Sequence, residues 1–415
     1  MKETSIELVI LNQYYVPDVA STGHLLYELA TESASRNVAV KVVTSFPSYG
    51  PPESWQPCPG REIQEGVRVH RLRTTRFSKD RIFGRLMNSL TFLIPLFFRQ
   101  LLAGSKNRVF LYTTNPPFLG IIGALVSLLR PHRYVVLLHD SYPHLAVWSG
   151  KIQPNGLIER IWHMGNRLIY LRASQTIVLC VRAKELVCKK YGVDPSCVHV
   201  VHNWADPKAL VPLNKADSNF AKKHGFDQVF TLLYSGNLGL YYEFESLLQA
   251  ADRLRSDPSI HFVFIGAGGK RQWLANEIKS RNLTNTTLFP YQPFEALNDS
   301  LNACDASLVT ISKGIEGISF PSKVYSSLAV GKPVIAISED GSELKEMVEG
   351  SGSGIWIPLG DVDALVKAIQ RLQVDAKLRE TMGKAARVTM ENHYTIRTAT
   401  DEYLRIIRLA SGEAN

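Results

Sequence analysis

The chain has 415 residues, of which 45% are hydrophobic and 20% are charged. This composition is ordinary for a globular protein and excludes disordered, collagen-like and disulfide-dense chains, and the length predicts two or three domains. Five scattered cysteines without a C-x-x-C pair indicate neither a disulfide framework nor a zinc site. We therefore expect a reducing, cytoplasmic location.

The net charge of +9 is unevenly distributed along the chain. Residues 1–210 contain 25 basic and 14 acidic residues, whereas the remainder contains 22 and 24, and the basic excess is greatest in 68–85. This stretch is either a solvated basic face or a surface for an anionic membrane or a phosphate-bearing acceptor. Nucleic acid is a weaker candidate because no helix-turn-helix, zinc or RNA-binding signature accompanies the basic residues. The apolar tract 86–103 is too interrupted to predict a membrane-spanning helix.

Short apolar runs rich in β-branched residues alternate with amphipathic helical patterns along the whole chain. In the first half the predicted strands are 7–11, 38–43, 67–72, 109–113, 134–139 and 176–180, and the predicted helices include 24–35 and 156–171. In the second half the predicted strands are 230–235, 261–266, 306–310, 333–337 and 354–358. Such alternation predicts parallel sheets with crossover helices, hence an α/β fold with two doubly wound, Rossmann-like domains joined by a linker at 202–214. Ligands of such sheets bind beyond the carboxyl ends of the strands, so we expect a cleft between two facing domains.

Glycines follow predicted strands in both halves. Gly23 is expected to precede a helix, where it either begins that helix or lets a phosphate approach its N-terminus. Neither Gly23 nor Gly268, in the segment FIGAGG (264–269), belongs to a dinucleotide or Walker fingerprint. We interpret Gly268 as part of a tight turn near a nucleotide.

The segment beginning at Pro321 is the most informative. Pro321 is expected at the first position of a helix, and Ser322 and Lys323 offer N–H groups, a hydroxyl and an ammonium to a diphosphate. His139 and Asp140 end a buried strand and are candidate substrate contacts, although a local structural role stays open. The D-x-D pair at 361–363 is best explained by helix capping, so no metal is predicted.

In these motifs the chain resembles the family-4 retaining glycosyltransferases of the GT-B fold. The resemblance covers nearly the whole chain and extends over 17–23, His139-Asp140, YSGNLG (234–239), FIGAGG (264–269), NACDASLVT (302–310), PSKVYSSLAVGKPVIA (321–336), Glu343 and GDVDALVKAI (360–369). The YSGN and PSK segments are similar to those of the bacterial branch that makes exopolysaccharide, including colanic-acid-type enzymes.

The resemblance implies metal-independent transfer of a sugar from a nucleotide sugar, UDP by default, to a lipid-linked or polysaccharide acceptor, with no cofactor. It implies an acceptor domain (1–205), a donor domain (206–392) and a C-terminal helix (393–415) that packs back on the first domain. An N-terminal domain of this family often rests on a membrane, so the inner face of the plasma membrane is the expected site. The implied donor contacts are Gly23, Gly236, Asn237, Gly268, Tyr291, Ser322, Lys323 and Ser326; the implied catalytic residues are His139, Asp140 and Glu316; the implied acceptor or membrane contacts are Arg76, Arg81 and Arg85.

The chain departs from the family pattern at two acidic positions. Ile318 and Ser326 stand where many members have glutamates, and Glu316 is a candidate substitute. An Arg and a Lys that many members direct at the diphosphate are also missing, with Asn237, Leu240 and Tyr242 in that region. The alternatives are therefore a non-catalytic nucleotide-sugar-binding homologue, or another GT-B enzyme such as a sugar-nucleotide epimerase.

Overall fold

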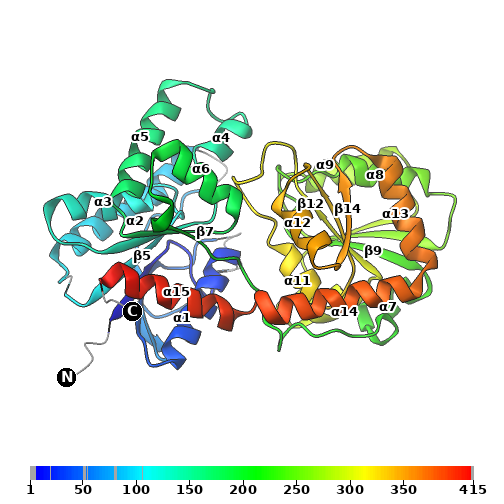
Figure 1. Cartoon of the computed structure of the whole chain (residues 1–415), viewed down its shortest axis with the longest axis horizontal. Coiled ribbons are helices and arrows are strands. Elements are labelled where there is room, and N and C mark those ends of the chain that lie inside the picture. Colours follow the sequence, from blue (N-terminus) through cyan, green and yellow to red (C-terminus); the bar gives the residue numbers. More distant parts are fainter. Residues whose placement is uncertain are drawn as a thin grey trace. The chain divides into compact units, whose positions relative to one another are not determined.

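The computed structural model describes residues 6–18, 20–49, 53, 55–78, 82–104 and 106–412. The chain divides into two compact α/β units (Figure 1). Unit 1 comprises Met1–His202, Gly317–Ser319 and Ile396–Asn415, and unit 2 comprises Asn203–Glu316 and Phe320–Thr395.

Unit 1 is built on one sheet, which has eight strands in the described part of the chain, in the order β3-β4-β2-β1-β5-β6-β7-β8. All neighbouring strands are parallel except β3 and β4. Its strands are β1 (Glu7–Leu11), β2 (Ala39–Ser45), β3 (Arg61–Gln64), β4 (Val67–Leu72), β5 (Arg108–Thr113), β6 (Tyr134–Leu138), β7 (Gln175–Val178) and β8 (Val198–Val200). The central strands are apolar along their whole length because helices bury both faces of a parallel sheet.

Helices cover both faces of this sheet. They are α1 (Ser21–Ser35), α2 (Ile82–Leu102), α3 (Leu119–Leu129), α4 (His144–Trp148), α5 (Leu157–Arg172), α6 (Val181–Tyr191) and α15 (Ile396–Ser411). Helices α1 and α15 pack together on one face, whereas α3 packs between α2 and α5 on the other (Figure 1). No helix among the described residues is long and apolar enough to cross a bilayer.

Unit 2 contains a second parallel sheet, with six strands among the described residues, in the order β11-β10-β9-β12-β13-β14. Its strands are β9 (Phe230–Ser235), β10 (Ile260–Ile265), β11 (Thr286–Phe289), β12 (Ala306–Thr310), β13 (Val334–Ser338) and β14 (Gly354–Pro358). Its helices are α7 (Asn219–His224), α8 (Glu245–Arg253), α9 (Arg271–Ser280), α10 (Leu297–Asn302), α11 (Lys323–Ala329), α12 (Glu343–Gly350), α13 (Val362–Val374) and α14 (Ala376–His393).

The predicted fold class, two Rossmann-like α/β domains, is confirmed. The capping interpretation of the D-x-D pair is also confirmed, because the Asp361 side chain accepts the Ala364 N–H at 2.9 Å at the start of α13, and Asp363 pairs with Arg253. In unit 2 the core lies between the sheet and its helices, with Phe262, Phe264 and Leu365 fully buried.

Candidate active site

Lys323 is the first residue of α11, and two aromatic rings surround its ammonium. The Nζ atom lies 3.4 Å from the centroid of the Tyr242 ring and 4.8 Å from that of Tyr234. Burial lowers the pKa of this ammonium well below its ordinary value, and no carboxylate in the described part of the chain offsets that effect. A buried cation held only by aromatic faces is incompletely compensated, so it can gain a bound anion as its partner.

Two glycine-containing loops form the surroundings of Lys323 at the carboxyl ends of β9 and β10. Gly236 has φ +138°, and a side chain there would put its Cβ 3.2 Å from Cε of Lys323. Gly268 has φ +151°, and its Cβ would lie 2.5 Å from Oδ1 of Asn237. The loops are joined where the Leu238 N–H donates to the Ala267 carbonyl at 2.8 Å. Only glycine satisfies both the backbone angle and the available space at these two positions.

Four other predicted donor contacts lie in the same unit. The Asn237 side chain is exposed beside Gly268, and the backbone carbonyl of Asn237 accepts a hydrogen bond from the Tyr234 hydroxyl at 2.7 Å. Tyr291 is 54% exposed and close enough to Tyr234 to contribute to raising its pKa. Ser322 is exposed directly before α11, whereas the Ser326 hydroxyl donates to the Lys323 carbonyl at 2.9 Å.

Tyr242 and Lys270 were not assigned a role from the sequence. Tyr242 holds the Lys323 ammonium, and Nζ of Lys270 donates to the Tyr242 carbonyl at 2.6 Å. The available signals were the paired tyrosines after the YSGNLG loop and a lysine directly after the glycines of FIGAGG. A cation–π partner is not recognisable from spacing alone, because the two residues lie about 80 positions apart in the chain.

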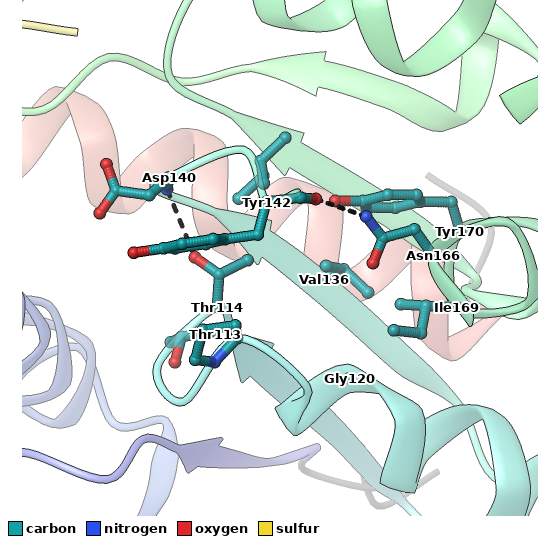
Figure 2. Close-up of a pocket in the computed structure, with 11 residues that line it drawn as sticks. Thr113, Thr114, Gly120, Val136, Asp140, Tyr142, Asn166, Ile169 and Tyr170 are labelled. Carbon is teal, nitrogen blue, oxygen red and sulfur yellow. Dashed lines mark hydrogen bonds between the residues drawn. The ribbon is translucent and has the colours of Figure 1, made fainter. Parts of the chain in front are cut away.

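Two of the predicted catalytic residues, His139 and Asp140, lie in unit 1, directly after β6. Figure 2 shows Asp140. The backbone N–H groups of His139 and Asp140 lie 3.3 and 3.4 Å from Oγ1 of Thr114. The Ser319 hydroxyl donates to Oδ1 of Asp140 at 3.0 Å, and the Ser141 N–H donates to the Ile318 carbonyl at 2.9 Å. Asp140 is thereby held in place by residues from two other parts of the sequence, Thr114 and the segment 318–319.

Burial shifts both side chains toward their neutral forms. It raises the pKa of Asp140, an effect that the Ser319 hydrogen bond opposes, and it lowers the pKa of His139 to about 4. Nδ1 of His139 is buried without a hydrogen-bond partner in the described part of the chain. An imidazole that stays neutral, next to a buried carboxyl group, can bind hydroxyl groups through hydrogen bonds.

A small cavity adjoins Asp140 and is lined by Thr114, Tyr142 and Asn166 (Figure 2). Its volume is about 10 Å³, which is the space that one water molecule needs. The Asn166 amide donates to the Tyr142 carbonyl at 2.6 Å and fixes one wall. This cavity is too small for a sugar, so it can hold only a solvent molecule beside the carboxyl group.

Two expectations about helix starts are wrong. Gly23 does not precede a helix but lies in the first turn of α1, and its Cβ would be only 3.0 Å from the Tyr14 carbonyl. Because Gly23 has no side chain, α1 can pack closely against the backbone of Tyr14. This favours a structural role for Gly23 over a contact with phosphate. Pro321 is not the first helical residue, because α11 begins at Lys323 and Ser322 is its N-cap.

Glu316 is in unit 2, where its carboxylate accepts the Glu343 N–H at 3.1 Å at the start of α12.

The basic residues proposed to face the acceptor or membrane are in unit 1. Arg76 is exposed with its guanidinium 5.1 Å from the Trp55 ring centroid, and Arg85 is exposed on α2. Arg81 lies outside the described residues. No group of three or more His, Cys, Asp or Glu side chains within the described ranges is arranged to hold a metal ion.

Comparisons with known proteins agree with the division of the chain into two units. Residues 22–204 match the family described as glycosyl transferase 4-like domain, and residues 216–389 match glycosyl transferases group 1. The two matches together cover most of the chain, which therefore belongs to the glycosyltransferases, with a group 1 domain at 216–389. The glycosyltransferase is 26% identical over 338 residues to the probable glycosyltransferase WbjE of Pseudomonas aeruginosa, covering 80% of this chain and 82% of WbjE.

A second relative is the putative colanic acid biosynthesis glycosyl transferase WcaI of Escherichia coli K12. It is 32% identical over 209 residues, which cover 50% of the glycosyltransferase and 51% of WcaI. Among solved structures, HepE of Anabaena in complex with UDP has the same fold, with a TM-score of 0.72 and 15% identity over 96% of this chain and 99% of HepE. HepE is also known in complex with UDP-glucose.

Proposed function

We propose that this glycosyltransferase moves a sugar from a UDP-sugar to a lipid-linked or polysaccharide acceptor in cell-surface glycan synthesis, with retention of anomeric configuration and without a metal ion. The observation that carries the proposal is Lys323, a buried cation without a carboxylate partner in the described part of the chain, beside Gly236 and at the carboxyl end of β9. UDP complexes of HepE and the colanic acid context of WcaI support the choice of donor and pathway class.

The proposed reaction needs no protein nucleophile. The bond between the sugar C1 and the β-phosphate oxygen breaks, and a bond from C1 to the acceptor oxygen forms on the same face of the sugar. The acceptor hydroxyl gives its proton to the β-phosphate of the departing UDP. The Lys323 ammonium stabilises the negative charge that accumulates on that diphosphate, which is the electrostatic contribution that a fixed cation supplies in a site screened from water.

In unit 1, His139 would bind the donor sugar and Asp140 would contact the acceptor hydroxyl. The raised pKa of Asp140 and the lowered pKa of His139 support these roles, because substrate contacts of this kind are often shifted toward neutral forms. Glu316 is the proposed replacement for a missing family glutamate near the sugar. Its bond to the Glu343 N–H keeps the carboxylate at a defined position.

Proton NMR of the reaction with UDP-glucose and other UDP-sugars, in the presence of EDTA, tests this function. With membrane glycolipid extract as acceptor, we expect consumption of one donor and a product anomer identical to that of the donor. An inverted product would contradict retention. Binding without turnover would favour the non-catalytic alternative, and conversion to an isomeric sugar nucleotide without acceptor would favour an epimerase.

We also propose that unit 1 binds an anionic membrane surface through α2, α3 and α5. On α2, a row of exposed apolar side chains recurs at intervals of three or four residues, and Leu102 at its end is 84% exposed. Its members are Phe83, Leu86, Leu90, Ile94, Phe98 and Leu102. Such a row on one helix face is typical of a helix that lies in a membrane interface.

Exposed apolar side chains also occur on α3, which packs against α2, and on α5, which packs against α3. Exposed apolar residues are Leu125, Leu128 and Leu129 on α3, and Leu157, Ile158, Ile161, Met164 and Leu171 on α5. Residues 81–172 contain eleven Lys or Arg but two acidic residues, Asp140 in the small cavity and Glu159, which bonds His163. An exposed apolar helix face, in a segment with many basic and few acidic residues, fits an anionic bilayer.

A further inference from the structure

A second cavity lies in unit 2, at the end of the sheet opposite to Lys323. Its volume is about 640 Å³, within the range of small-molecule sites. Asp305 directly precedes β12, and Lys332 lies just before Pro333 and the start of β13 at Val334. The cavity therefore lies at the amino ends of these strands. Gly236 follows β9 at the carboxyl end, so the cavity is separate from the candidate donor site.

The lining of this cavity has an excess of positive charge. Its cations are Lys215, Lys332, Arg379, Lys384 and Arg387, and its carboxylates are Asp305 and Glu380. Each carboxylate is already paired, Asp305 with Lys215 and Glu380 with Lys384. Three cations therefore have no carboxylate of the lining as a partner, and only Arg387 reaches one outside it, Glu391 at 2.7 Å.

The two arginines have a structural role as well. Arg379 donates to the carbonyls of Leu372 and Gln373 at the end of α13, and Arg387 donates to the Ala329 carbonyl at the end of α11. Capping of helix ends explains why these side chains lie where they do. It accounts for neither the open volume beside them nor Lys332, which also lines the cavity.

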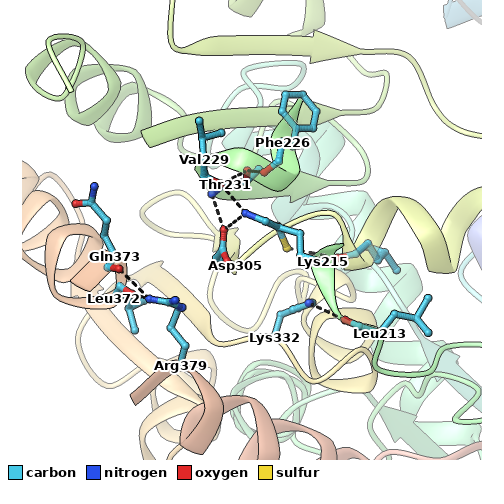
Figure 3. A network of polar contacts seen from close by, with 12 residues as sticks. Leu213, Lys215, Phe226, Val229, Thr231, Asp305, Lys332, Leu372, Gln373 and Arg379 are labelled. Carbon is cyan, nitrogen blue, oxygen red and sulfur yellow. Dashed lines mark hydrogen bonds and ion pairs between the residues drawn. The ribbon is translucent and has the colours of Figure 1, made fainter. Parts of the chain in front are cut away.

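Lys332 has no such explanation. In Figure 3 its ammonium reaches the Leu213 carbonyl, at 3.2 Å, which is its one hydrogen bond among the described residues. Burial lowers the pKa of this ammonium; the nearby Cys304 and Asp305 oppose that effect, and Lys215 adds to it. An ammonium has three donors, so two N–H groups of Lys332 are available to a ligand in the cavity.

We propose that this cavity is a second binding site of the glycosyltransferase, for a small phosphorylated anion held by Lys332 and Arg379. A dianionic phosphate group fits because it offers several acceptor oxygens and balances the two cations that lack a carboxylate partner in the described structure. The site lies away from the donor residues of the same unit, so its ligand does not compete with the sugar nucleotide for Lys323.

Calorimetric titration of the full chain with inorganic diphosphate, at constant ionic strength, tests the proposal. The titration uses Lys323→Met protein, because the native chain is expected to bind diphosphate at the donor site too. We expect binding that Lys332→Met weakens at least about ten-fold, the loss of a charge-assisted hydrogen bond. The matched control is Lys377→Met, an exposed lysine of α14 outside the lining, and it should leave the affinity unchanged. No binding, or equal binding by the Lys332→Met protein, would overturn the proposal.

Hydrogen exchange of the native chain keeps the test valid if the Lys332 variant does not fold. Diphosphate should slow exchange in 330–334 and 376–388. Protection confined to 234–239 and 266–270 would place all of the bound diphosphate in the donor site and overturn the proposal. Parallel titrations with a hexose 1-phosphate and with UDP would assign the anion to a sugar phosphate or to a nucleotide.

Discussion

The Lys323 ammonium lies 3.4 Å from the centroid of the Tyr242 ring. Tyr242 belongs to the loop after β9 and Lys323 to the start of α11, so this contact joins two parts of the sheet's carboxyl end. Many members of the family have a basic residue in the loop that carries Tyr242. In this chain an aromatic face holds a single lysine, and in the proposed function the charge of the diphosphate is balanced mainly by that lysine.

Replacing Tyr242 should therefore affect donor binding through Lys323. A cation–π contact of a desolvated ammonium contributes about 1–2 kcal/mol. Tyr242→Leu should weaken UDP binding several-fold, because the ammonium loses the face that orients it, whereas Tyr242→Phe should bind as the native chain does. Calorimetric titration with UDP measures both variants. Equal weakening by Phe and Leu would show that the hydroxyl matters and the ring face does not.

The ionised carboxylate of Asp140 should lower the free energy of unfolding at neutral pH. Burial raises the pKa of its carboxyl group in the folded chain, so ionisation above the ordinary pKa of 3.8 costs folding free energy. Asp140→Asn should be more stable than the native chain at pH 7, and the difference should disappear as the pH falls below about 4. Urea unfolding at both pH values measures this.

The Asn variant keeps the acceptor atom for the Ser319 hydroxyl, so the comparison isolates the charge. A variant less stable than the native chain at pH 7 would mean that the ionised carboxylate stabilises the fold. Activity should fall in the same variant, because Asp140 is the proposed contact of the acceptor hydroxyl. Residues that act on substrates often lower the stability of the fold, so a gain in stability together with a loss of activity is expected.

The apolar face of α2 and α5 should control membrane binding. The double variant Ile94→Ser with Met164→Ser should bind anionic vesicles at least about thirty-fold more weakly, because each apolar side chain contributes about 1 kcal/mol or more when it enters the interface. Val374→Ser is the matched control, since Val374 is 81% exposed on α13 of the other unit.

Co-sedimentation with vesicles of anionic and of neutral lipids measures this binding. The native chain should prefer the anionic vesicles, and high salt should reduce the preference because it screens the basic residues. Equal binding to both lipid types, or an unchanged double variant, would contradict the proposed surface.

Gly268→Ala should destabilise unit 2 and weaken UDP binding. The new Cβ would lie 2.5 Å from Oδ1 of Asn237 and from the Leu238 backbone, so the two loops must separate. Gly352→Ala is the control, because Gly352 also has a positive φ of +66° but no heavy atom within 4 Å. Thermal unfolding should show a clearly larger loss for Gly268→Ala than the strain of about 1 kcal/mol expected at Gly352. Equal losses would mean that backbone strain alone matters at Gly268.

Much of the fold follows from the sequence because central parallel strands are continuous apolar runs. Strands β1, β4, β9, β12 and β14 have the predicted bounds. The strands β3, β8 and β11 were not predicted, because they have three or four residues each and lie at sheet edges with partly exposed side chains. Short edge strands have little hydrophobic pattern to detect.

The candidate site was less predictable than the fold. Lys323 was identifiable because a lysine beginning a helix is unfavourable without an anion. Tyr242 was not, since its importance depends on a contact between distant segments. The position of Gly23 before the helix was predicted wrongly. Gly23 lies within α1 and allows that helix to pack closely against Tyr14, a contact that a sequence pattern does not reveal. The hydrogen bond from Ser319 to Asp140 likewise joins residues 179 positions apart.

The central claim is that Lys323 forms a metal-independent site for the diphosphate of the donor. Calorimetric titration with UDP, GDP, ADP and TDP, all with EDTA, tests it most directly. The control is Lys345→Met, because Lys345 also contacts an aromatic ring, Trp356 at 3.8 Å, but is paired with Asp340. The account predicts selective binding of UDP that Lys323→Met abolishes and Lys345→Met leaves intact. Absence of binding by the folded native chain, or undiminished binding by Lys323→Met, would contradict it.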